Sequence, residues 1–133
     1  MTRDRVMKNA TPKAIQLQDY QPPAFLIDDV DLLFKLHDTG TRVVSRLTIR
    51  RNPSCADSSL RLDGEGLNPI SVRIDDRELP ADRYRVDDTS LTLLDPPPQF
   101  VLDTEVEIAP ESNTALEGLY RSGGLFCTQC EAE

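Results

Sequence analysis

Apolar and polar residues alternate along the chain from Phe25 onward with a period of two, which is typical of half-buried β-strands. The clearest run holds Val30, Leu32, Phe34 and Leu36 on one face. After the turn Asp38-Thr39-Gly40, a second run places Val43, Leu47 and Ile49 on one face and Arg46, Thr48 and Arg50 on the other. The two runs therefore predict an antiparallel hairpin.

Shorter alternating runs follow as far as Ile108, separated by turn-forming residues such as Asp63-Gly64-Glu65-Gly66. The stretch Asp95-Pro96-Pro97-Pro98 excludes both a helix and a central strand, because three consecutive prolines remove three backbone donors. No stretch before Ala109 has the spacing of an amphipathic helix. We therefore predict an all-β fold, an antiparallel β-sandwich or saddle-shaped sheet of about seven or eight short strands with a loop-rich C-terminal segment.

The chain divides into two parts on this pattern. Residues 1–24 have no sustained period and contain Pro12, Pro22 and Pro23, so we expect an extended N-terminal arm. Residues 25–133 form the β-domain, and a length of 133 residues suits one hydrophobic core.

Charge and cysteine content exclude some classes of partner and indicate the cellular compartment. Fifteen Lys and Arg against 23 Asp and Glu give a net charge of -8, which would repel nucleic acids and anionic membrane surfaces. No stretch is long and apolar enough for a membrane span, and residues 1–13 lack the apolar region of a secretion signal. Three cysteines are an odd number for a disulfide framework, so we expect a cytoplasmic protein. From its charge we expect no nucleic-acid or membrane partner.

The alternation ends in the segment 109–133. Leu116, Leu119 and Tyr120 have the spacing of a single helical turn, but Gly118, Gly123 and Gly124 argue against a longer helix. We expect a long loop here, and long loops of this kind are often functional.

The loop contains Cys127-Thr128-Gln129-Cys130, a CxxC motif with three interpretations. In the first interpretation the motif is half of a zinc site, which would need Cys55, His37 or a distant carboxylate as further ligands. In the second it is a redox pair, which requires a helix starting at the first thiol. In the third, which we favour, the two thiols pack the loop against a partner surface.

Other candidate residues carry weaker signals. Glu131 and Glu133 are a pair of carboxylates suited to acid–base chemistry or cation binding, but pairs are common in a chain with 23 acidic residues. His37 lies at an outward position of a predicted strand and is typical of a solvated surface histidine. Phosphate-binding glycine motifs and the zinc motif H-E-x-x-H are absent from the sequence.

A longer string is more specific than any of these features. The run from Asn113 to Tyr120 (NTALEGLY), then Ser122-Gly123-Gly124 and the run from Cys127 to Glu133 (CTQCEAE), resembles the segment that closes the first domain of the bacterial aminopeptidase N family. A looser similarity extends back to about Tyr20. The resemblance implies a β-saddle or sandwich domain placed before a zinc-containing catalytic domain.

What the resemblance implies for function is substrate recognition. Members of the family remove N-terminal residues from peptides with one zinc ion held by an H-E-x-x-H helix and a further glutamate. By resemblance, Glu131 binds the free α-ammonium of the substrate and Gln129 lines the pocket for its first side chain. Since the zinc ligands are absent from the 133 residues, we expect this chain to bind no zinc and to be inactive alone.

The same resemblance implies that the segment 109–133 is a loop leading into a missing catalytic domain. The partners of the chain would then be that catalytic domain and, in the intact enzyme, the N-termini of peptides. An apolar patch around Leu119, Tyr120, Leu125 and Phe126 would then be exposed. Two alternatives stay open from the residues themselves: a stand-alone β-sandwich module that binds a protein without catalysis, and a small domain stabilised by a metal on the CxxC thiols.

Overall fold

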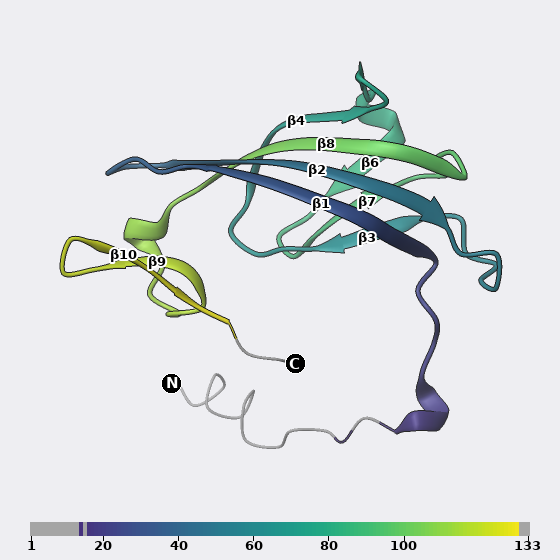
Figure 1. The fold of residues 1–133 in the computed structure, drawn as a ribbon, viewed down its shortest axis with the longest axis horizontal. Coiled ribbons are helices and arrows are strands. Elements are labelled where there is room, and N and C mark those ends of the chain that lie inside the picture. The colour runs from purple at the N-terminus through teal and green to yellow at the C-terminus, as the bar shows by residue number, and fades with distance from the viewer. Residues whose placement is uncertain (1–13, 15, 131–133) are drawn as a thin grey trace.

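The computed structural model describes residue 14 and residues 16–130, and within them ten strands form three antiparallel sheets (Figure 1). The largest sheet has the strand order β1 (Phe25–Lys35), β2 (Thr41–Arg51), β8 (Gln99–Ile108), β4 (Asn68–Ile74) and β5 (Arg77–Glu78). The second sheet has the order β3 (Leu60–Asp63), β7 (Ser90–Leu93) and β6 (Tyr84–Val86). The third is a hairpin of β9 (Gly118–Ser122) and β10 (Leu125–Gln129).

The helical elements of the described residues are three single turns of 3-10 helix: η1 (Leu17–Asp19), η2 (Ala81–Arg83) and η3 (Pro110–Ser112). None of the helices among these residues is long and apolar enough to cross a membrane. The all-β fold predicted from the alternation is therefore confirmed.

The predicted hairpin is the pair β1 and β2, which are joined by a turn that ends at Gly40 with φ +72°. One extra residue, Asp28, forms a bulge in β1 opposite the regular strand β2. The bulge shifts the alternation by one position, so that Ile27 before it and Val30 after it lie on the same face of the sheet.

Strand β8 is the centre of the large sheet because it pairs with β2 on one side and β4 on the other. Its residue Leu102 lies between Leu47 of β2 and Ile74 of β4 and is fully buried. The apolar core lies between the large sheet and the three-stranded sheet, and its buried members are Phe25, Ile49, Leu60, Val72, Leu93, Phe100 and Leu102. Phe25 and Phe100 meet there edge to face, with ring centroids 6.1 Å apart.

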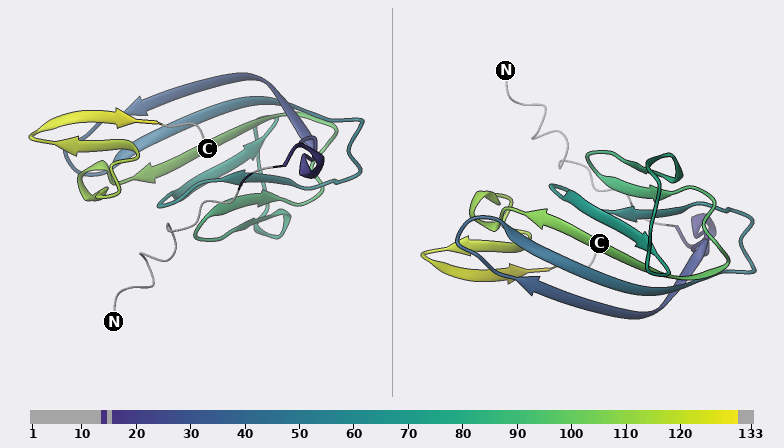
Figure 2. Two further views of the ribbon diagram at one scale, coloured as in Figure 1. Left: turned by 90° about the horizontal axis from the view of Figure 1, so that it is seen from below. Right: turned by 90° about the horizontal axis from the view of Figure 1, so that it is seen from above.

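The three-stranded sheet and the β9–β10 hairpin lie on the same side of the large sheet, toward its opposite ends (Figures 1 and 2). The core fills only the end covered by the three-stranded sheet. Toward the hairpin, the inner face of the large sheet continues with Leu32, Phe34 and Val43, of which Leu32 and Phe34 are exposed. The result is an open apolar groove beside the core.

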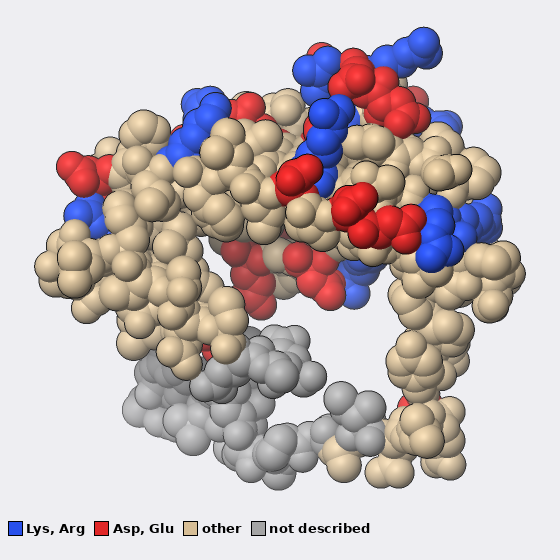
Figure 3. Space-filling view, viewed as in Figure 1, with Lys and Arg blue, Asp and Glu red and all other residues tan. Residues whose placement is uncertain are grey.

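The outer face of the large sheet carries charged pairs. Arg42 of β2 contacts Glu105 of β8 at 3.3 Å, and Arg46 contacts Asp103 at 3.2 Å. Figure 3 shows basic and acidic side chains gathered over the large sheet, whereas the surface around the β9–β10 hairpin is mostly uncharged. Solvent-exposed ion pairs contribute about 0–1 kcal/mol each, so this face supplies solubility more than stability.

The structure differs from the sequence expectation in the number of strands and in the N-terminal arm. Strand β5 and the strands β9 and β10 were not predicted, which is why there are ten strands and not seven or eight. In the arm 1–24, η1 interrupts the extended chain that we expected, while residues 1–13 and 15 lie outside the described part.

Candidate functional site

The β9–β10 hairpin carries the residues that the sequence singled out. It forms because Gly123 and Gly124, with φ of +58° and +81°, make a two-residue turn between the paired residues Ser122 and Leu125. Turns of this shape need positive φ at both central residues, and glycine reaches these angles without a steric penalty. The segment expected to be a loop is thus a hairpin from Gly118 to Gln129.

The single helical turn expected from Leu116, Leu119 and Tyr120 is not formed, since Leu119 and Tyr120 belong to strand β9. The spacing that indicated a helix is too short to decide between the two structures. A Gly-Gly pair between two short runs was the available signal for a hairpin.

The two predicted substrate-binding residues lie at the end of this hairpin or beyond it. Gln129 is the last residue of β10, opposite Gly118 of β9, and it is exposed. Glu131 and Glu133 lie outside the described residues. The role of both predicted residues therefore stays a prediction.

The cysteines of the CxxC motif do not come together as a site. Cys127 lies within β10, half-buried, and its sulfur is 3.9 Å from the carbonyl oxygen of Leu125. Cys130 follows the strand, is exposed and lines the apolar groove. Because Cys127 is part of a strand, the helix that a redox pair requires is absent at this position.

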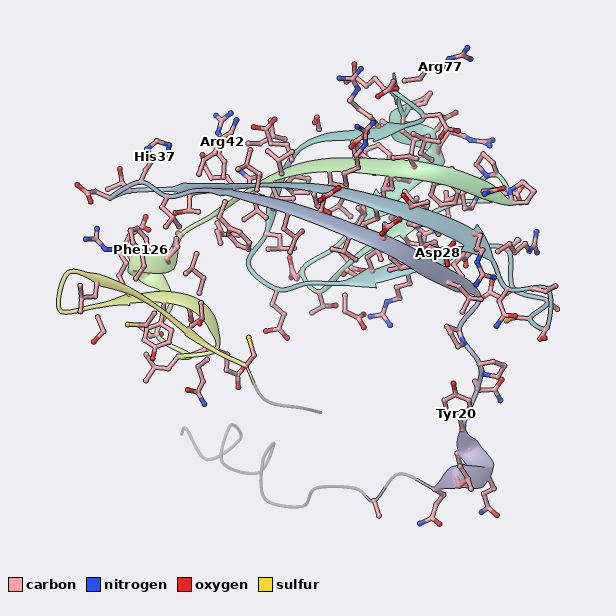
Figure 4. The ribbon with its side chains drawn as sticks, in the orientation of Figure 1. Tyr20, Asp28, His37, Arg42, Arg77 and Phe126 are labelled. Carbon is pink, nitrogen blue, oxygen red and sulfur yellow. The ribbon has the colours of Figure 1, made fainter. Side chains whose placement is uncertain are left out.

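A metal site is likewise not formed by the part of the chain from 16 to 130. There, no group of three or more His, Cys, Asp or Glu side chains is arranged to hold a metal ion. His37 is exposed in the β1–β2 turn and points away from the hairpin in Figure 4.

Polar contacts fix the hairpin against the β1–β2 turn. The Arg121 guanidinium donates hydrogen bonds to the backbone oxygen and the side chain of Asp38, both at 3.2 Å, and to the carbonyl of Gly124 at 3.1 Å. It also lies 4.9 Å from the centre of the Phe126 ring, and the Arg121 side chain is only 23% exposed. Glu111 of η3, which precedes the hairpin, accepts a hydrogen bond from the Gly40 amide of the same turn at 3.1 Å.

The loop before β9 is shaped by Asn113. Its side-chain nitrogen donates to the carbonyls of Glu117 and Leu119, at 2.7 and 2.9 Å. Its side-chain oxygen accepts a hydrogen bond from the Ala115 amide at 3.2 Å. Within this loop Leu116 has φ +59°, a left-handed conformation that costs a leucine roughly 1–2 kcal/mol.

The groove between the hairpin and the two larger sheets has a volume of about 660 Å³. Its walls are mostly apolar; they include Phe34, Leu36, Val43, Val106 and Ile108 beside the large sheet, Leu62, Val86 and Leu91 from the three-stranded sheet, and Leu119, Thr128 and Cys130 at the hairpin.

Asp87, at the edge of the groove, organises the turn between β6 and β7. The amides of Thr89 and Ser90 both donate to one oxygen of its carboxylate at 2.8 Å, and the Ser90 hydroxyl donates to the other oxygen at 3.0 Å. The Thr89 amide, followed by the Ser90 hydroxyl, lowers the pKa of Asp87 below its ordinary value. The carboxylate stabilises the turn by accepting these hydrogen bonds, and it has no partner in the groove among the described residues.

Comparison with known proteins identifies relatives along nearly the whole chain. It is 51% identical over 127 residues to aminopeptidase N of Caulobacter vibrioides and 41% identical over 122 residues to aminopeptidase N of Escherichia coli. These matches cover 96% and 92% of this chain but only 15% and 14% of the two enzymes. No protein-family profile matches the chain.

Solved structures agree in fold. Aminopeptidase A of Legionella pneumophila, crystallised with aspartic acid, superposes with a TM-score of 0.78 at 27% identity over 90% of this chain and 14% of its own. An M1 zinc metallopeptidase of Deinococcus radiodurans superposes with a TM-score of 0.60 at 16% identity, over 81% of this chain and 27% of its own. The resemblance stated from the sequence is thereby confirmed, and the chain is a homologue of aminopeptidase N that spans about 15% of the length of the relatives it matches.

Proposed function

We propose that this chain is the N-terminal substrate-recognition domain of a zinc-dependent aminopeptidase that removes N-terminal amino acids from peptides. The observation that carries the proposal is the 51% identity to aminopeptidase N over 96% of the chain. The Legionella neighbour, which was solved with an amino acid, is consistent with a role in amino-acid recognition.

Glu131 is the residue that we propose to bind the free amino terminus of the peptide. A carboxylate held at the end of a cleft makes charge-assisted hydrogen bonds to an α-ammonium group. The same carboxylate disfavours a blocked amino terminus, which has no charge to pair with it, and this would account for exopeptidase specificity. Gln129, two residues earlier at the end of β10, would contact the first side chain of the substrate.

The chemistry of peptide hydrolysis would come from the rest of such an enzyme. A zinc ion bound there would supply Lewis-acid polarisation of the peptide carbonyl and activation of a water molecule. The 133 residues contain no H-E-x-x-H motif, so the chain would contribute binding and orientation and would be inactive alone. The apolar groove and the exposed Leu125 then offer a surface to the catalytic domain, and the location would be cytoplasmic.

The proposal is tested with Glu131→Ala in a full-length enzyme, made from the chain's own reading frame or by placing residues 1–133 in the matching part of the Caulobacter enzyme. For an unblocked alanyl substrate we expect kcat/KM to fall by an amount equivalent to about 2–5 kcal/mol. Glu78→Ala, at an exposed position of β5, is the matched control and is expected to leave kcat/KM unchanged. Unchanged kcat and KM in Glu131→Ala would exclude the proposed role.

A second candidate is a stand-alone β-sandwich module that binds a protein without catalysis. The observation that favours it is the open groove, because large apolar surfaces mark interaction sites. Reading the gene beyond codon 133 separates the two candidates. An open frame that leads into H-E-x-x-H supports the aminopeptidase, and a stop codon supports the module.

A further inference from the structure

Strand β1 lies at one edge of the large sheet and pairs with β2 on one side only (Figure 2). Because β1 is 11 residues long, the backbone groups on its other side form a long row without a strand partner in the part of the chain from 16 to 130. The opposite edge, β5, has only two residues. A short edge strand offers little to pair with, whereas a long one is a template for a further strand.

The inner face of β1 is apolar but uncovered. Ile27, Val30, Leu32 and Phe34 lie on the same face of the sheet as the core, yet their side chains are 45–56% exposed. Ile49 of β2, which pairs with Ile27, is fully buried on that face. The exposure of β1 therefore comes from the lack of a neighbour beside it and not from the direction of its side chains.

The outer face of β1 carries two carboxylates, Asp29 and Asp31, that form no ion pair with any described residue. Arg46 lies opposite Asp31, but its guanidinium contacts Asp76 and Asp103, both at 3.2 Å. Opposite charges on neighbouring strands stabilise a sheet and like charges destabilise it. The strand that fits this edge therefore has apolar residues toward the core and Lys or Arg on its outer face.

We propose that the free edge of β1 is completed by such a strand, supplied by the part of the aminopeptidase outside these 133 residues. This inference rests on the proposed function, since it takes the strand from the larger enzyme. The matched region is only 15% and 14% of the two aminopeptidase N relatives, so most of their length lies outside it. A strand in the same polypeptide reaches the edge at a high effective concentration. The recognition domain is then joined to the rest of the enzyme by a continuous sheet.

The first test compares two adjacent leucines of β1 that lie on opposite faces. Leu32 on the inner face is 54% exposed, and Leu33 on the outer face is 56% exposed. Each is replaced by cysteine in the full-length enzyme described above, and alkylation of the β1 peptide by iodoacetamide is followed by mass spectrometry, with the unfolded enzyme as reference. We expect Leu32→Cys to react at least about tenfold more slowly than Leu33→Cys. Equal rates would overturn the inference.

Amide hydrogen exchange distinguishes a paired strand from any other cover. In the full-length enzyme, the β1 amides that do not bond to β2 should exchange at least about a hundredfold more slowly than in the unfolded chain. Fast exchange there would overturn the inference even if Leu32→Cys reacts slowly, because the face would then be covered without a strand. Protection that disappears when the enzyme is diluted would also overturn it, because the strand would then come from a second copy.

A change of charge tests the basic character of the added strand. Asp29→Lys should speed exchange at the β1 amides that do not bond to β2 by about 3- to 10-fold. Asp88→Lys is the matched control, because Asp88 is exposed in the turn between β6 and β7, and it should leave these amides unchanged. Unchanged exchange in Asp29→Lys would overturn the proposed charge of the strand. An equal effect on the amides that bond to β2 would do the same, because the charge would then act on β2.

These measurements are made without substrate, so they are separate from the test of the proposed function. An unprotected β1 in a full-length enzyme that hydrolyses an unblocked alanyl substrate would overturn this inference and leave the proposed function intact. A full-length protein from the chain's own reading frame that hydrolyses no such substrate would refute the proposed function, whatever the state of β1.

Discussion

Replacing Leu102 with alanine tests whether the thin core between the two larger sheets provides the stability of the fold. Its side chain is 0% exposed at the centre of β8, and the buried residues Val72, Leu93 and Phe100 belong to the same cluster. Leu102→Ala removes the transfer free energy of the lost carbons and leaves a cavity that paired strands on both sides prevent from closing. We expect a loss of about 3 kcal/mol within the usual range of about 2–5 kcal/mol.

A loss of about 3 kcal/mol is a large part of the total stability, because domains have free energies of unfolding of about 5–15 kcal/mol. The assay is urea unfolding of the 133-residue chain followed by far-UV circular dichroism, since the chain has no tryptophan. Leu33→Ala is the matched control: Leu33 lies in β1 with 56% exposure, so the same exchange should cost about 0.5 kcal/mol or less. A loss below about 1 kcal/mol for Leu102→Ala, or equal losses for the two variants, would refute the assignment of the core.

Two further predictions concern polar groups. The Thr41 hydroxyl is fully buried and has no hydrogen-bond partner among the described residues. Thr41→Val should therefore raise the free energy of unfolding by about 1 kcal/mol. A clear decrease in the free energy of unfolding would instead show that the hydroxyl has a hydrogen-bond partner. Because the pKa of Asp87 is lowered in the fold, its contribution to stability is present above the unfolded pKa and is lost as pH falls through the folded pKa. Unfolding measured between pH 7 and pH 2 should therefore depend less on pH in Asp87→Asn, and an unaltered profile would contradict the role of its carboxylate in the turn.

Local pattern predicted the parts of the fold that depend on neighbouring residues. The β1–β2 hairpin follows from the alternation on both sides of Asp38-Thr39-Gly40, and it is confirmed. The bulges at Asp28 and Ile70 were not visible in the sequence, because each depends on which residue of a partner strand lies opposite. Nor could the pattern assign ten strands to three sheets, since strand order is decided by contacts distant in sequence.

The candidate site was less accessible to such reasoning. The residues Gln129 and Glu131 came from a resemblance to a family and not from the spacing of chemical groups. The roles of Asn113 and Arg121 are visible only in three dimensions, because their partners are backbone carbonyls and, for Arg121, a turn 83 residues away. A backbone carbonyl leaves no signature in the sequence.

The bulge in β1 has a consequence for how the chain behaves in solution. Among the described residues β1 and the two-residue strand β5 are the edges of the large sheet, and an edge strand of 11 residues such as β1 offers unpaired backbone groups to strands of other molecules. The bulge at Asp28 disturbs that edge, and Asp29 and Asp31 place negative charge along it. A second copy that aligned its own β1 there would bring like charges together, so the bulge that keeps Ile27 and Val30 on one face and the two aspartates that follow it both disfavour strand pairing between copies at this edge.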